Sequence, residues 1–154
     1  MAKHANFQEV NTTLFDQHGV EYPVWIRETK LGQQDTIEVI SGWQLSEKEL
    51  EFFNETGIVF FRAVGGQPPC EILWADPVEF EGQNAVYTHE ACYDLPTHRA
   101  ETVINGRSTF TVTSAWQLNR EGREEVRKNG GIIFLRVVGG QPVVEVFGIN
   151  PIEG

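Results

Sequence analysis

The chain has 154 residues, of which 40% are hydrophobic and 11% aromatic, a composition typical of a folded globular protein. Its formal net charge of −10 argues against nonspecific binding to nucleic acid or to an anionic membrane, because both need clustered positive charge. The two cysteines, Cys70 and Cys92, are too few for a disulfide framework or a four-cysteine zinc site.

The first predicted elements are a weakly patterned N-terminal segment and a β-hairpin. Residues 1–21 are expected to form an arm or a strand added to one sheet. Residues 24–31 and 36–43 are predicted strands, and apolar and polar side chains alternate in the second, which indicates one buried face. The glycine-containing turn between them predicts a hairpin.

A short helix and a second hairpin follow. Ser46 and Glu49 have the spacing of a capping box, so a helix is predicted to begin after Ser46. Gly57 is expected to end that helix in a left-handed conformation. Residues 58–64 and 70–74 are apolar runs separated by a Gly-Gly-Gln-Pro-Pro turn, which predicts a hairpin between them.

A polar linker, residues 81–94, is followed by a second copy of the same unit. Residues 22–80 and 95–154 align at an offset of 73, which becomes 74 after one residue is gained in the helix. We therefore predict an α+β fold, a tandem duplication of a ββαββ unit with mostly antiparallel sheets and one short helix per repeat. Since units of about 60 residues are marginal alone, the halves are expected to pack pseudo-symmetrically and share a core. Matching pairs include Trp43/Trp116, Phe60/Phe134, Arg62/Arg136, Gln67/Gln141 and Glu71/Glu145.

Duplicated polar and aromatic residues are the candidates for binding a ligand or partner. Each arginine offers a planar bidentate donor for a carboxylate or another anion. The alternative is an ion pair with a glutamate on the next strand, Glu71 or Glu145. Each tryptophan is either a core residue or a stacking platform for a ring ligand. The candidate residues are Trp43, Arg62, Gln67, Trp116, Arg136 and Gln141.

Catalytic and metal-binding patterns are sparse. The linker region contains His89, Cys92 and His98, which could supply three zinc ligands or a thiolate with a base. The first repeat has no equivalent cluster, and there is no Ser nucleophile elbow or helical His-Glu-x-x-His. The Gly-Gly-Gln-Pro turn lacks the following helix and Lys-Ser/Thr of a phosphate loop. We expect no enzyme activity, no cofactor and no metal.

The segments from Trp43 to Pro77 and from Trp116 to Pro151 resemble a family of small proteins encoded by bacteriophages and prophages. The shared pattern is Trp-x-Leu, a Glu-rich helix, Gly-Ile, an apolar strand and Gly-Gln-Pro-Pro, although Val143 replaces the second proline in the second repeat. The resemblance implies a phage protein and carries no catalytic residues with it.

These features lead us to expect a non-enzymatic bacteriophage accessory protein that binds another protein. The partner is either a phage structural protein, with this chain as a virion accessory or decoration subunit, or a host factor that is inhibited; self-association is a further alternative. The rival functions are sequestration of an anionic nucleotide, mimicry of nucleic acid and an enzyme based on Cys92. With no membrane-spanning run and no signal peptide, the expected location is the host cytoplasm or the virion.

Overall fold

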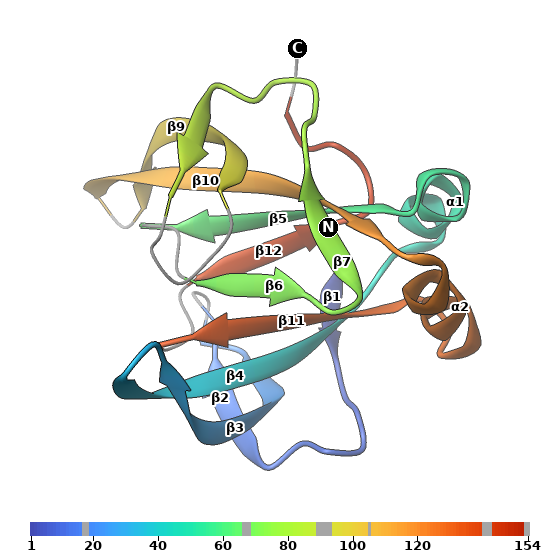
Figure 1. Cartoon of the computed structure of the whole chain (residues 1–154), viewed down its shortest axis with the longest axis horizontal. Coiled ribbons are helices and arrows are strands. Elements are labelled where there is room, and N and C mark those ends of the chain that lie inside the picture. Colours follow the sequence, from blue (N-terminus) through green and yellow to red (C-terminus); the bar gives the residue numbers. More distant parts are fainter. Residues whose placement is uncertain (17–18, 66–68, 89–93, 105, 140–142, 153–154) are drawn as a thin grey trace.

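The computed structural model describes the chain except for residues 17–18, 66–68, 89–93, 105, 140–142 and 153–154. It consists of two antiparallel sheets, each of six strands, with one short helix in each half of the chain. Both helices lie at the same end of the molecule (Figure 1). The predicted α+β fold with a duplicated unit is confirmed.

Each sheet is built mainly from one repeat. Sheet A has the strand order β2-β3-β4-β11-β6, with β1 also pairing with β4. Its strands are β1 (Lys3–Ala5), β2 (Thr12–Phe15), β3 (Glu21–Leu31), β4 (Gln34–Gln44), β6 (Cys70–Ile72) and β11 (Ile132–Val138). Sheet B has the order β12-β5-β10-β9-β8, with β7 also pairing with β10. Its strands are β5 (Ile58–Val64), β7 (Ala75–Val78), β8 (Ala85–Tyr87), β9 (Leu95–Ile104), β10 (Arg107–Leu118) and β12 (Val144–Phe147).

The first hairpin and the helix caps form as the sequence predicts. Strands β3 and β4 pair from Val24 opposite Ser41 to Leu31 opposite Gln34, next to the turn. Helix α1 (Glu47–Thr56) begins with a complete capping box, and Gly57 ends it with φ 69°. Helix α2 (Arg120–Lys128) has Asn119 as its N-cap, with the side chain accepting from the Gly122 amide.

The second predicted hairpin is wrong, because β5 does not pair with β6. Strand β5 lies between β10 and β12 in sheet B, whereas β6 pairs with β11 in sheet A (Figure 1). Each repeat therefore gives one interior strand to the sheet of the other repeat. The two apolar runs around the Gly-Gly-Gln-Pro-Pro turn were misleading because β5 and β11 carry the same outward side chains. The sequence pattern therefore suits the pairing of either strand with β6 or β12.

The structural repeat is also longer than the sequence match. Strands β7 and β8 hold the same positions in sheet B as β1 and β2 hold in sheet A, again at an offset of 73. Asn11 accepts a hydrogen bond from the Ile26 amide and donates one to its carbonyl, both 2.9 Å. Asn84 makes the same two bonds to Arg99, at 2.7 and 3.0 Å. The predicted arm and linker are therefore equivalent parts of the duplicated unit.

One hydrophobic core lies between the sheets and draws on both repeats, as expected for units too small to be stable separately. Every second residue of β5 and β11 points into it. These inward pairs differ between the repeats, Phe61 with Ala63 in β5 against Leu135 with Val137 in β11. Large and small side chains are exchanged so that the total volume changes little, which cores tolerate well.

Helix α2 fits against the other repeat because it contains a glycine. A Cβ atom on Gly122 would lie 2.4 Å from the Cβ of Trp74, so only glycine leaves room for this indole. The reciprocal position is Gly148, where a Cβ would lie 2.7 Å from the Cβ of Glu49 in α1. Gly122, which removes the capping box of the second helix, is thus required by contact between the repeats.

Candidate functional site

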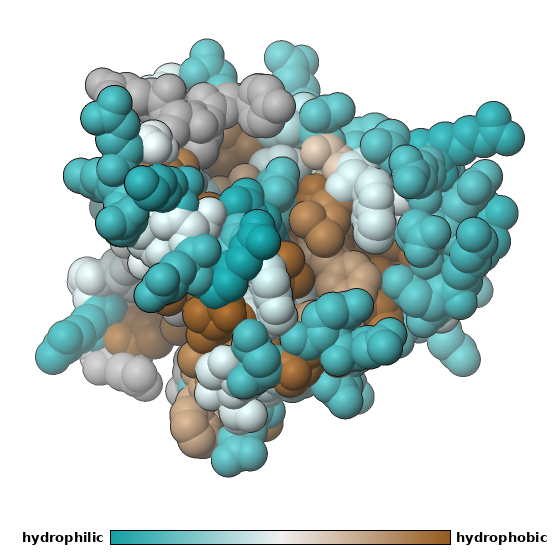
Figure 2. Space-filling model, turned by 60° about the horizontal axis from the view of Figure 1, so that its bottom comes forward, coloured by the Kyte–Doolittle hydropathy of each residue, from teal (hydrophilic) through white to brown (hydrophobic). Residues whose placement is uncertain are grey.

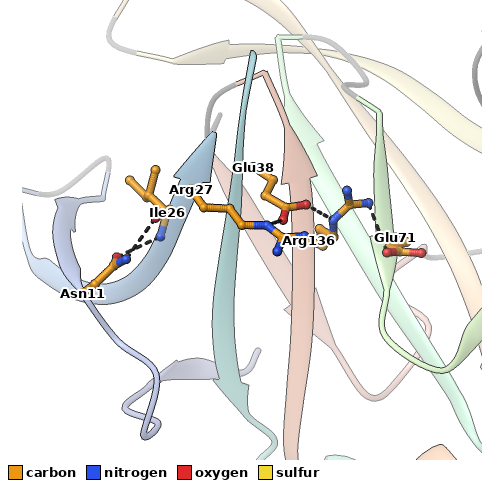
Figure 3. A network of polar contacts seen from close by, with 6 residues as sticks. All are labelled: Asn11, Ile26, Arg27, Glu38, Glu71 and Arg136. Carbon is orange, nitrogen blue, oxygen red and sulfur yellow. Dashed lines mark hydrogen bonds and ion pairs between the residues drawn. The ribbon is translucent and has the colours of Figure 1, made fainter. Parts of the chain in front are cut away.

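A row of alternating charges crosses the outer face of sheet A (Figure 3). The buried carboxylate of Glu38, only 1% exposed, accepts hydrogen bonds from the Nε atoms of Arg27 and Arg136. Nη1 of Arg136 also donates to Oε1 of Glu71 at 3.2 Å. The sequence-predicted pairing of an arginine with Glu71 therefore exists, but the arginine comes from the other repeat.

Strand register explains why these four side chains meet. Glu38 lies directly opposite Arg27 on β3, and Arg136 lies directly opposite Glu71 on β6. Arg136 faces Ile40, two residues along β4 from Glu38, so Arg136 and Glu38 are diagonal neighbours on one face. A buried carboxylate is costly unless it is paired, and here two guanidinium groups compensate it.

Sheet B keeps the equivalent arginine but has lost this network. Thr111 replaces Glu38 and Ala100 replaces Arg27. Arg62 instead donates from Nε to Oγ1 of Thr113 at 3.1 Å, and its Cζ lies 5.1 Å from the ring centroid of Phe147. Among the described residues Arg62 forms no ion pair, although Glu145 is opposite it in register.

The two predicted tryptophans are core residues, although Trp116 also borders a hollow beside Arg136. Trp43 and Trp116 are each 3% exposed, and their indole N–H groups donate to Ser41 and Ser114 at 2.8 and 2.9 Å. A satisfied indole inside the core is the expected state of a structural tryptophan. The two remaining predicted residues lie outside the described residues: Gln67 and Gln141.

The two arginines lie on different sheets, Arg62 on sheet B and Arg136 on sheet A. Arg136 borders a shallow hollow of about 390 Å³ together with Glu71, Asp76 and the edge of Trp116. Arg62 does not line this hollow. The charge of Arg136 is already balanced by two carboxylates, and Lys30, the second cation that lines the hollow, lies 3.7 Å from Oδ1 of Asp35. The hollow therefore has little to offer an anion.

A second groove beside the charge row is almost wholly apolar. It holds about 300 Å³ on the outer side of sheet A, and its walls are half-buried aromatic and aliphatic side chains. We call it the sheet A groove, lined by Phe7, Glu9, Trp25, Ile40, Leu73, Trp74 and Phe134. The space-filling view from the side where sheet A lies shows apolar side chains gathered in the middle of a largely hydrophilic face (Figure 2).

The ring contacts and charges of the groove are well defined. Phe7 meets Phe134 edge to face, with ring centroids 5.4 Å apart. Cζ of Arg27 lies 4.9 Å from the ring centroid of Trp25, so the charge row borders the groove on this side. Glu9 is exposed and forms no ion pair with any described residue. It is the groove's one charged lining residue.

The matching region of sheet B is more polar and is covered. His98 and Thr113 take the places of Trp25 and Ile40, and Thr113 is fully buried. Gly82 takes the place of Glu9, and a Cβ there would lie 2.7 Å from Cγ2 of Ile152. The C-terminal residues therefore contact the loop before β8, whose counterpart in the first repeat carries Glu9.

Only His98 of the predicted cluster His89, Cys92 and His98 belongs to the part of the chain that the structure describes. Nδ1 of His98 lies 2.8 Å from the carbonyl oxygen of Gly82, while His89 and Cys92 fall outside the described residues. The described residues contain no group of three or more His, Cys, Asp or Glu that could hold a metal ion. Neither helix in the described part of the chain is long and apolar enough to cross a membrane.

No protein-family model, curated protein or solved structure matches the chain significantly. Functional inference therefore depends on the geometry of the site. Sequence reasoning did not find the sheet A groove because its residues come from five separate segments. A usable signal was present at two positions, where Trp25 and Ile40 are apolar but the second repeat has His98 and Thr113.

Proposed function

We propose that this protein is a non-enzymatic bacteriophage accessory protein that acts by binding another protein, through the sheet A groove. The observation that carries the proposal is the difference between two equivalent surfaces. On sheet B the surface is covered by the chain itself, whereas on sheet A four aromatic side chains remain half-exposed around a hollow. Aromatic residues in such a hollow are typical anchors of protein interfaces.

The phage origin rests on the sequence resemblance of the segment from Trp43 to Pro77 and its repeat. Within that setting the partner is a virion structural protein or a host factor. The net charge of −10 favours a partner with a neutral or basic surface over nucleic acid.

The arginines give less support to binding of an anionic nucleotide. Such a site needs an uncompensated cation beside an accessible ring. Arg136 is paired with Glu38 and Glu71, and Trp43 and Trp116 are buried. Arg62 has no ion pair among the described residues, but it lies on the other sheet, where its guanidinium packs over Phe147. A protein-binding role uses the exposed apolar groove and needs neither an uncompensated cation nor a ring that stacks on a nucleobase. It also explains why the groove is absent from the equivalent part of sheet B.

Site-specific photo-crosslinking in phage-infected or producing cells tests the proposal. A photoreactive phenylalanine analogue would replace exposed Gln8, beside the groove, and in the matched control its exposed sheet B counterpart Glu81. We expect one defined protein adduct from position 8 that the additional change Ile40→Thr removes, and no such adduct from position 81. Equal adducts at both positions, or no protein adduct at position 8, would contradict a binding role for the groove.

The same experiment separates the accessory and inhibitory roles. Mass spectrometry of the adduct identifies either a virion structural protein or a host protein, and sedimentation of purified particles shows whether the chain travels with them. The variant Cys92→Ser should give the same adduct as the unmodified chain. Loss of the adduct in this variant would instead favour the cysteine-based enzyme.

A further inference from the structure

The covered surface of sheet B shows what kind of segment this fold can hold at such a place. The last described residues of the chain run over the loop before β8 and place an aliphatic side chain, Ile152, against Gly82. Nδ2 of Asn150 donates to the carbonyl of Glu81 at 3.0 Å, and its Oδ1 accepts from the Ile152 amide at 2.9 Å. The covering element is thus a short irregular segment with one apolar anchor.

Sheet A has no such cover from the described part of the chain. The counterpart of the C-terminal segment is Ala75–Val78, which forms β7 and pairs with β10 in sheet B. The two loops also differ, because Glu9 stands where the second repeat has Gly82. A segment lying on the sheet A groove would therefore meet a carboxylate beside its apolar anchor.

The charges around the groove favour a positively charged segment. Arg27 and Arg136 are both held by Glu38, and Glu71 supplies a second carboxylate to Arg136. Glu9 has no cation partner among the described residues, so its charge is the one left unbalanced at the groove. The whole chain adds a long-range negative field with its net charge of −10.

From these contacts we infer that the sheet A groove takes a short extended segment of a partner protein in which an aliphatic anchor is flanked by Lys or Arg. The anchor fills the hollow between Phe7, Trp25 and Phe134, and a flanking cation pairs with Glu9. This inference rests on the proposed function, since it names the chemistry of the partner at the same groove.

Peptide titration of the full ¹⁵N-labelled chain tests the chemistry directly. The probes are a capped Gly-Ser-Lys-Ile-Lys-Ser-Gly peptide, the same peptide with both Lys changed to Glu, and the same peptide with Ile changed to Ser. The readout is the tryptophan indole signals in NMR spectra. The protein has four tryptophans, and two of them line the groove while two lie in the core, which gives an internal control.

We expect the Lys-Ile-Lys peptide to shift the indole signals of Trp25 and Trp74 and to leave those of Trp43 and Trp116 in place. Glu9→Gln should weaken binding about two- to fivefold, the range of one exposed ion pair. Ile40→Thr, which installs the sheet B residue, should weaken it about fivefold or more by removing apolar contact. The Ser-substituted peptide should cause no shift.

Two results would overturn the inference. If the Glu-Ile-Glu peptide binds as well as the Lys-Ile-Lys peptide, or if Glu9→Gln has no effect, the basic character of the partner is wrong. If no peptide shifts the indole signals of Trp25 or Trp74, a short segment is not the occupant. The adduct at position 8 is measured separately, so a protein partner of other chemistry would still be detected in both cases.

Discussion

The charge row on sheet A makes a quantitative prediction, because the two repeats contain the same arginine with and without a buried carboxylate. Arg136→Met removes one of the two cations that compensate Glu38, and Met keeps most of the apolar stem. Breaking a buried ion pair costs about 3 to 5 kcal/mol. Since Arg27 remains as the second partner, we expect about 3 kcal/mol of lost unfolding free energy.

The matched control is Arg62→Met, at the equivalent position of the other repeat. Arg62 donates a hydrogen bond to Thr113 but has no ion pair among the described residues. Loss of one such hydrogen bond costs about 1 kcal/mol. At about 2 to 4 °C per kcal/mol for a chain of this size, the melting temperature should fall by about 6 to 12 °C for Arg136→Met and about 2 to 4 °C for Arg62→Met.

Urea denaturation followed by tryptophan fluorescence measures both variants, because Trp43 and Trp116 pass from the core to water on unfolding. Adding Glu38→Met to Arg136→Met should recover most of the loss, since removing both buried partners costs far less than removing one. An Arg136→Met variant no less stable than Arg62→Met would show that Glu38 does not depend on Arg136 for compensation. A double variant less stable than Arg136→Met alone would show the same.

Three further predictions concern the contacts between and within the repeats. Gly122→Ala should lower the free energy of unfolding by about 1 to 3 kcal/mol in urea denaturation, because the new Cβ meets Trp74. In an ordinary helix the same change would be stabilising. Glu121→Ala on the same helix is the neutral control. Asn11→Ala and Asn84→Ala should each cost about 1 kcal/mol, and unequal losses of melting temperature would count against the longer repeat. Either repeat produced alone should fail to form a folded monomer, since its sheet lacks an interior strand; circular dichroism with analytical ultracentrifugation checks this.

Local sequence patterns were sufficient for the elements that depend on near neighbours in the chain. The capping box of Ser46 and Glu49 and the left-handed Gly57 are set by residues within a few positions of each other. The β3–β4 hairpin is likewise a local structure with a short turn. Such features need no knowledge of the rest of the fold.

Strand exchange could not be read from the same patterns, because the duplication makes the competing pairings almost identical. Phe60 and Arg62 on β5 recur as Phe134 and Arg136 on β11, so Glu71 on β6 finds an arginine opposite it in either pairing. The β1 and β7 regions were missed for the opposite reason. Their sequences share few residues, and the equivalence is visible only in backbone pairing with β4 and β10.

The candidate site was only partly predictable for a related reason. Alternation along a strand shows which side chains share a face, but it does not show whether that face is covered. The duplicated residues of β5 and β11, such as Arg62 and Arg136, lie on the outer faces, whereas the core-facing residues vary. Identity between the repeats therefore pointed to Arg136 and its partner Glu71 but not to Arg27 or Glu38, and it missed the groove, where Trp25 and Ile40 occur in one repeat only.

That difference between the repeats is the strongest physical argument for a role of the groove beyond stability. The fold tolerates His98 and Thr113 on sheet B, where Thr113 is fully buried and the adjoining loop at Gly82 is contacted by the C-terminal residue Ile152. A protein that needed only to be stable could have polar residues at the equivalent positions of both sheets. Sheet A instead keeps Trp25 and Ile40 half-exposed, which leaves apolar area in water at a cost of about 25 cal/mol per Å². Contact with a partner would remove this area from water and recover that free energy.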